Sequence, residues 1–162
     1  MALLRERLAS LPATSLGGRV VRAADDFSYV DPVDDADTAI RLFRVAAHRP
    51  WRHETLGFLL DHDGRGGTIY VVAGNAGTDD LIEVVAYLCA EALRDPRLCS
   101  LVVASVCPDV ARQCCRGSYE ADRWCAASDL ADEHGIELIE WFVIHPDRVE
   151  CPRELAGEPE RW

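Results

Sequence analysis

Lysine is absent from this sequence, in which all 17 basic residues are arginines. This absence excludes chemistry that requires a lysine side chain: a Walker-type phosphate-binding loop, a Schiff base or a serine–lysine dyad. No apolar run approaches the roughly 20 residues that a transmembrane helix needs. The apolar patch in MALLRERLASLP is interrupted by Arg5, Glu6 and Arg7 and is too short for a signal peptide. We therefore expect a cytoplasmic protein without a membrane segment.

Basic residues are also few relative to acidic ones. The chain has 28 acidic and 17 basic residues, which gives a formal net charge of -11. This balance argues against the general attraction to phosphates that underlies most nucleic-acid binding. The 162 residues are enough for one domain that buries roughly 70% of its unfolded surface. We find no internal repeat or linker, so we expect a single domain over residues 1–162 that folds without a disulfide or a metal.

The cysteines form no standard motif. There are seven of them, so they cannot all pair within one chain, and in a cytoplasmic protein they are expected to be reduced. Cys89 and Cys99 lie in apolar segments and are predicted to belong to the core. No CxxC pair occurs, and the spacing of the remaining cysteines matches no standard structural zinc motif. A redox role for this group stays open: Cys107, Cys114, Cys115 and Cys125.

Hydrophobic periodicity predicts three helices and several strands. The helices are expected over residues 36–47, 78–94 and 119–134, with Asp34 or Asp35, Thr78 and Ser118 as N-caps and Gly135 as the last C-terminal stop. Residues 54–61 and 67–73 are predicted to form a β-hairpin around HDGRG. A strand covered on both faces is predicted at 99–106 and a final strand at 136–144, and GRVVRAADDFSYV could hold one more strand. This order predicts an α/β or α+β sandwich with a mixed sheet.

Two segments carry a resemblance to a known family. RHETLGFLLD opens the predicted hairpin, and LVVASVCPD follows a predicted helix. In this order they resemble the RadC-like branch of the JAB/MPN (JAMM) family of zinc metalloproteins, over about Glu54 to Ile144. The resemblance implies a JAB/MPN, cytidine-deaminase-like sandwich. It divides the chain into an extension (1–33), a core (34–144) and a surface tail (145–162).

Active members of that family use zinc held by two histidines and an aspartate, and a glutamate as general base on the zinc-bound water. The resemblance places Glu54 at the glutamate and Pro108 at the proline that follows the histidines. Ser105 and Cys107 stand where the two histidines belong. Serine is a poor zinc ligand, whereas cysteine binds zinc readily. The metal motif is therefore expected to be degenerate at these positions.

A serine and an aspartate complete the family motif. Ser118 and Asp122 resemble this pair, with one extra residue between them and a longer loop before them. If the site were active, the resemblance would make Glu54 and Ser118 catalytic residues and Cys107 and Asp122 zinc ligands.

Three functions follow from these observations. The leading prediction is a non-catalytic RadC-like JAB/MPN domain without a cofactor, which binds a protein partner. The first alternative is a zinc metallohydrolase that cleaves a peptide or isopeptide bond through a rearranged cysteine and aspartate site. The second alternative is an accessory protein associated with DNA repair, which the acidic composition disfavours.

Overall fold

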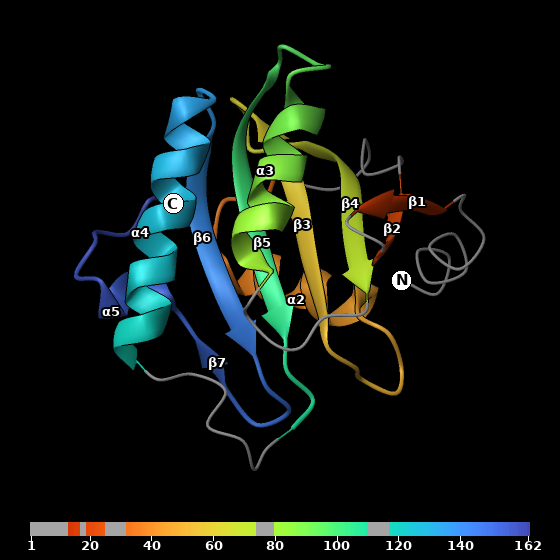
Figure 1. Cartoon of the computed structure of the whole chain (residues 1–162). Helices are drawn as coiled ribbons and strands as arrows, with labels where there is room; N and C mark the ends of the chain where they lie inside the picture. The colour runs from red at the N-terminus through yellow and green to blue at the C-terminus, as the bar shows by residue number, and fades with distance from the viewer. Residues whose placement is uncertain (1–12, 17–18, 25–31, 74–79, 110–116) are drawn as a thin grey trace.

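A seven-stranded mixed β-sheet forms the centre of the molecule, with helices on both faces (Figure 1). The computed structural model describes residues 13–16, 19–24, 32–73, 80–109 and 117–162. The strands are β1 (Ala13–Leu16), β2 (Arg19–Ala24), β3 (Glu54–Asp61), β4 (Gly66–Ala73), β5 (Leu98–Val106), β6 (Glu137–Ile144) and β7 (Val149–Glu150). They lie in the order β1-β2-β4-β3-β5-β6-β7. All neighbours are antiparallel except β5 and β6, which are parallel.

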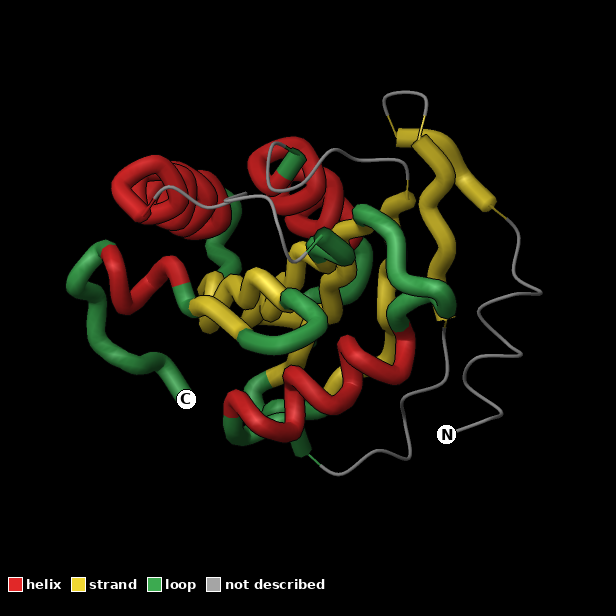
Figure 2. Tube along the Cα trace, turned by 90° about the horizontal axis from the view of Figure 1, so that it is seen from below, coloured by secondary structure: helices red, strands yellow, loops and turns green. Residues whose placement is uncertain are grey.

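Helices cover both faces of the sheet. Helix α2 (Ala36–Ala46) packs on one face, whereas α3 (Leu81–Ala92) and α4 (Gly117–Glu133) pack on the other. Figure 2 shows the sheet between these two layers. We refer to the two sides as the α2 face and the α3/α4 face. Helix α4 connects the two parallel strands, as a parallel pair requires.

Side chains of β5 contribute alternately to the cores on the two faces of the sheet. Leu101 and Val103 pack with the helices of the α3/α4 face. Val102 and Ala104 pack with Phe43 of α2 on the opposite face. Because successive side chains of a strand point to opposite faces, positions 101 and 103 belong to one core and positions 102, 104 and 106 to the other. The prediction of a mixed sheet whose fifth strand is covered on both faces is confirmed.

The predicted helices agree with the structure within a few residues. Helix α2 has Asp35 as its N-cap, whose Oδ1 accepts a hydrogen bond of 2.6 Å from the backbone N of Thr38. Helix α3 begins at Leu81 with Asp80 as N-cap, and the predicted cap Thr78 lies outside the described residues. Helix α4 already includes Ser118, so the N-cap prediction for that serine is wrong. Gly135 follows α4 with φ of 72°, as predicted for a C-terminal stop.

The predicted hairpin is confirmed as β3 and β4, and the later strands as β5 and β6. The N-terminal region differs from the prediction. It contains two strands, β1 and β2, which pair with each other and extend the sheet beyond β4. The sequence predicted only one strand there, because the short run at Ala13–Leu16 lacks the alternation that marks a strand.

The C-terminal segment is part of the packed structure, which corrects the prediction of a surface tail over 145–162. Strand β7 pairs with β6 at the edge of the sheet. The short helix α5 (Pro152–Leu155) follows, and its buried Arg153 donates a hydrogen bond of 2.6 Å to Glu140 on β6. The prolines and weak periodicity of this segment are typical of loops, whereas long-range contacts hold it against the domain: the β6–β7 pairing, the Arg153–Glu140 ion pair and the hydrogen bonds of Arg161 to Ser128 and Leu138. Within the described residues, no helix is long and apolar enough to cross a membrane.

Candidate functional site

The residues of the degenerate motif gather at one end of the sheet, where β3 begins and β5 and β6 end. In the register of the sheet, Glu54 lies opposite Val106, and Thr55 opposite Ser105. Cys107 follows β5 directly, and its backbone N donates a hydrogen bond of 2.9 Å to the carbonyl oxygen of Ile144. These positions therefore lie at the same end of the sheet.

Ser105 and Cys107 are both fully buried on the α3/α4 face. The Oγ atom of Ser105 accepts a hydrogen bond of 3.1 Å from Nε1 of Trp141. Cys107 is part of the apolar cluster of that face, together with Trp124. Pro108 is half-buried. Ser105 accepts a hydrogen bond from a buried indole, and Cys107 lies inside an apolar cluster. Both are therefore core residues.

Glu54 lies on the α2 face, where its buried carboxylate accepts hydrogen bonds from neighbouring residues. Oε1 accepts a hydrogen bond of 2.7 Å from the backbone N of His48. Oε2 lies 3.2 Å from Nδ1 of His48 and accepts from Nε of Arg52 at 3.4 Å. The carboxylate thus fixes the segment that leads from α2 into β3. This is a positioning role for the segment from His48 to Arg52.

The structure does not bring Glu54 together with Ser105 and Cys107, in contrast to the arrangement expected from the family. Glu54 and Val106 are paired and lie on the α2 face, and the neighbouring positions 105 and 107 point to the opposite face. The reason is the two-residue period of a strand, which separates even and odd positions by the thickness of the sheet. A general base and a metal at these positions would be on different sides of the sheet.

In helix α4 the acidic residue that faces the core is not Asp122, the predicted zinc ligand, but Glu120. Asp122 is exposed, whereas Glu120 is fully buried on the face that packs against the sheet. Cys107, which is fully buried, and the exposed Asp122 therefore do not form a shared ligand pair. The spacing of Glu120 with the apolar residues of the helix is the signal that indicates its burial: Trp124, Ala127 and Ala131.

None of the cysteines that the structure describes forms a disulfide bond. Cys89 is fully buried as predicted, but Cys99 is only half-buried. Burial raises the pKa of the Cys89 thiol to about 11, and burial together with the charge of Glu140 raises the pKa of Cys151 to about 12. Both are therefore protonated thiols at neutral pH. Cys114 and Cys115 lie outside the described residues. Within the described part, no three metal-ligating side chains gather at a common point.

A second group of residues at the same end of the sheet forms a cationic hollow. Arg44, Arg49, Trp51 and Pro146 line a space of ≈ 460 Å³, and we call these four residues the Arg–Trp surface. The guanidinium carbon of Arg49 lies 4.7 Å from the ring centroid of Trp51. Nη2 of Arg49 donates to the carbonyl oxygen of Arg44 at 3.4 Å. The sequence patterns did not predict this surface. Its signal is a group of basic and imidazole side chains close together in an acidic chain: Arg44, His48, Arg49 and Arg52.

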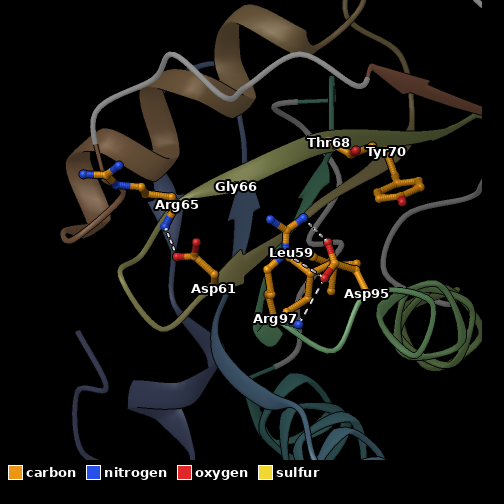
Figure 3. Close-up of a pocket in the computed structure, with 9 residues that line it drawn as sticks. Leu59, Asp61, Arg65, Gly66, Thr68, Tyr70, Asp95 and Arg97 are labelled. Carbon is orange, nitrogen blue, oxygen red and sulfur yellow. Dashed lines mark hydrogen bonds and ion pairs between the residues drawn. The ribbon is translucent and has the colours of Figure 1, made fainter.

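A second hollow, at the other end of the sheet, contains an ion pair between Asp95 and Arg97 (Figure 3). It measures ≈ 290 Å³ and is lined by residues of β3, β4 and the start of β5. Arg97 donates to both carboxylate oxygens of Asp95, at 3.0 and 2.7 Å. These hydrogen bonds lower the pKa of Asp95 to about 2. Asp61 accepts from the backbone N of Asp63 and Arg65. Arg97 and the carboxylates of Asp61 and Asp95 thus have partners within the protein.

Replacing Glu54 with alanine is expected to lower the free energy of unfolding by about 1–3 kcal/mol, because the partly buried backbone N of His48 would lose its acceptor, the buried Glu54 carboxylate. Chemical denaturation of both proteins measures this change. Asp109→Ala is a suitable control, because its carboxylate is exposed and lies 3.4 Å from His53. Equal stability of Glu54→Ala and the parent would contradict a structural role for Glu54.

Comparison with known proteins does not place the chain in a family. No family model matches it. A phosphoglucomutase from Rhizobium radiobacter is 61% identical over 36 residues, which are 22% of this chain and 7% of that protein. The chain therefore covers only a small share of that relative, and the match carries no conclusion about activity.

Proposed function

We propose that this chain is a non-catalytic RadC-like JAB/MPN domain that acts by binding another protein. One observation carries the proposal: the groups that a zinc hydrolase of this family would need at one metal lie on two faces of the sheet. Glu54 holds the segment before β3, and Ser105 holds Trp141. Both side chains serve the fold.

Element order and strand position support the assignment to the JAB/MPN family. A hairpin, a helix, a strand, a helix and a further strand follow one another, and the sheet is mixed. Ser105 and Cys107 lie two residues apart at the end of β5, on the same face. Two ligands from one extended segment require this spacing. The residues present there replace both histidines of the family motif.

The Arg–Trp surface supports binding of a protein. Arginine and tryptophan are enriched at protein interfaces and dominate their energetic hot spots. In this chain they occur together in an open hollow, although the net charge is -11. The zinc hydrolase alternative requires Glu54, Cys107 and Asp122 at one metal, and their placement does not favour it. The acidic balance does not favour a role in DNA repair.

We expect the protein, purified without chelator, to contain well under one zinc per chain. Imidazole is absent at positions 105 and 107, and Cys107 is buried in an apolar cluster. Elemental analysis measures the zinc content, and Cys107→Ala is the matched variant. Stoichiometric zinc that is lost in Cys107→Ala, together with cleavage of an isopeptide substrate, would contradict the proposal.

The binding function itself is tested with purified components. A tagged chain is recovered from its native host, a co-purifying protein is identified, and both proteins are then produced separately. We expect a saturable complex with one dissociation constant by calorimetry. If no protein forms a complex with the purified chain, the proposed function fails.

A further inference from the structure

We propose that the Arg–Trp surface docks a short acidic segment of the partner protein, in which carboxylates flank an apolar side chain. The inference rests on the proposed function and names the chemistry of the partner. The hollow of ≈ 460 Å³ falls within the size range of binding pockets. It is therefore large enough for a few side chains of a peptide.

The two arginines of the surface are available to an anionic ligand. Within the part of the chain that the structure describes, neither Arg44 nor Arg49 forms an ion pair, and both are exposed. The nearest acidic residue in sequence to Pro146 is Asp147, which pairs with Arg148 at 3.4 Å. A carboxylate can accept two parallel hydrogen bonds from a guanidinium group. Arg44 and Arg49 thus provide two positions for the carboxylates of a peptide.

The apolar part of the surface accounts for the proposed apolar side chain. Trp51 packs against the core of the α2 face and is partly exposed, and Pro146 is exposed. The stacking of Arg49 on the Trp51 ring holds its guanidinium group in place. Less side-chain freedom is then lost when a ligand binds. An apolar side chain between two carboxylates would contact the indole and proline rings.

The segment that presents the surface is itself fixed. The buried carboxylate of Glu54 accepts a hydrogen bond from the backbone N of His48, directly before Arg49. It also accepts from Arg52, directly after Trp51. The positioning role of Glu54 therefore extends to the Arg–Trp surface. A preorganised surface is what a binding site requires.

The charge of the whole molecule favours a peptide over a nucleic acid. A nucleic acid carries a continuous row of phosphates, and its binding depends on many basic contacts. The chain has 28 acidic residues against 17 arginines, so its overall field opposes a long polyanion. A short segment with two or three carboxylates needs only the local cations of the Arg–Trp surface.

The test uses fluorescence anisotropy with a labelled acidic peptide, acetyl-Asp-Leu-Glu-Leu-Asp, and its amide counterpart, acetyl-Asn-Leu-Gln-Leu-Asn. A labelled single-stranded oligothymidine is the third probe. The variants are the Arg44→Glu/Arg49→Glu double and Trp51→Ala. The matched control is the Arg65→Glu/Arg94→Glu double, which makes the same charge change with two exposed arginines at the other end of the sheet. Circular dichroism checks the fold of each variant.

We expect the acidic peptide to bind saturably, the amide peptide to bind much more weakly, and binding to weaken as salt rises. The Arg44→Glu/Arg49→Glu and Trp51→Ala variants should each lose about tenfold or more in affinity, as at interface hot spots. The control should stay within about twofold of the parent. Equal binding of both peptides, or an undiminished affinity of the Arg44→Glu/Arg49→Glu variant, would overturn the inference. So would tighter binding of oligothymidine, which would indicate a nucleic-acid site.

The partner identified under the proposed function separates the two claims. If the purified partner binds the parent and Arg44→Glu/Arg49→Glu equally well, the inference fails and the proposed function stands. If that variant loses the partner and the control keeps it, both stand. If the acidic peptide binds at the Arg–Trp surface but no protein does, the site stands and the proposed function fails.

Discussion

Replacing Arg153 with alanine is expected to lower the free energy of unfolding by about 3–5 kcal/mol at neutral pH. Nε of Arg153 donates to Oε2 of Glu140 at 2.6 Å, and both side chains are buried. Nη1 of Arg153 also donates to the carbonyl oxygen of Glu158 at 2.8 Å. The variant would leave the carboxylate of Glu140 buried without its cation. Loss of one partner of a buried pair costs far more than loss of an exposed pair.

The loss of stability in Arg153→Ala, relative to the parent, should become smaller as the pH falls. Burial raises the pKa of Glu140 above its ordinary value, and the hydrogen bond and charge of Arg153 oppose that rise. Without Arg153 the pKa in the folded state rises further. A folded-state pKa above the unfolded value means that stability is greatest below the unfolded pKa and falls as the pH rises through the folded pKa. Arg153→Ala is therefore closest to the parent in acid, where Glu140 is protonated, and furthest from it at neutral pH.

Urea unfolding of Arg153→Ala and the parent at several pH values measures both effects. Arg148→Ala is the control in the same segment, because Arg148 is exposed and its guanidinium group pairs with the partly exposed Glu150 at 2.7 Å and with the exposed Asp147 at 3.4 Å. We expect it to change stability by less than about 1 kcal/mol. A loss in Arg153→Ala that is small, or independent of pH, would contradict a buried ion pair that anchors the C-terminal segment.

Much of the fold is predictable from local sequence patterns. The apolar spacing of Ala39, Phe43 and Ala46 marks the buried side of α2, and Asp35 marks its beginning. The turn residues around Gly64, which has φ of 71°, predict the hairpin. These signals are local because helix periodicity, capping and turn geometry depend on neighbours within a few residues.

The site could not be predicted to the same degree. It depends on which face of a strand or helix each residue takes, and on contacts between residues that are far apart in the sequence. The sequence shows that Glu54 opens a strand but not which face it takes, and a shift by one residue reverses the face. In α4 the choice between Glu120 and Asp122 depends on the rotation of the helix, which Trp124 sets by its burial. The contact of Arg153 with Glu140 joins residues from different elements. No local pattern encodes the contact between Arg153 and Glu140.

Trp141→Ala is expected to lower the free energy of unfolding by about 3–5 kcal/mol, as for other fully buried tryptophans. The more specific change is Ser105→Ala. It would leave Nε1 of Trp141, which is buried and donates to Ser105 Oγ at 3.1 Å, without that acceptor. An unsatisfied buried donor costs about 1–3 kcal/mol. Ser100→Ala is the control, because Ser100 is also buried on β5 and makes no side-chain hydrogen bond among the described residues.

A double-mutant cycle with Ser105→Ala and Trp141→Phe isolates the hydrogen bond. We expect a coupling free energy of about 1 kcal/mol from urea unfolding, because either substitution alone removes the bond and the second then costs less. No coupling, together with an unchanged stability of Ser105→Ala, would show that the serine is not engaged by the indole. Position 105 would then be open to a ligand, as in a metal site. A measured coupling means instead that position 105 serves the core, since one side chain cannot bind a buried indole and a catalytic metal at once.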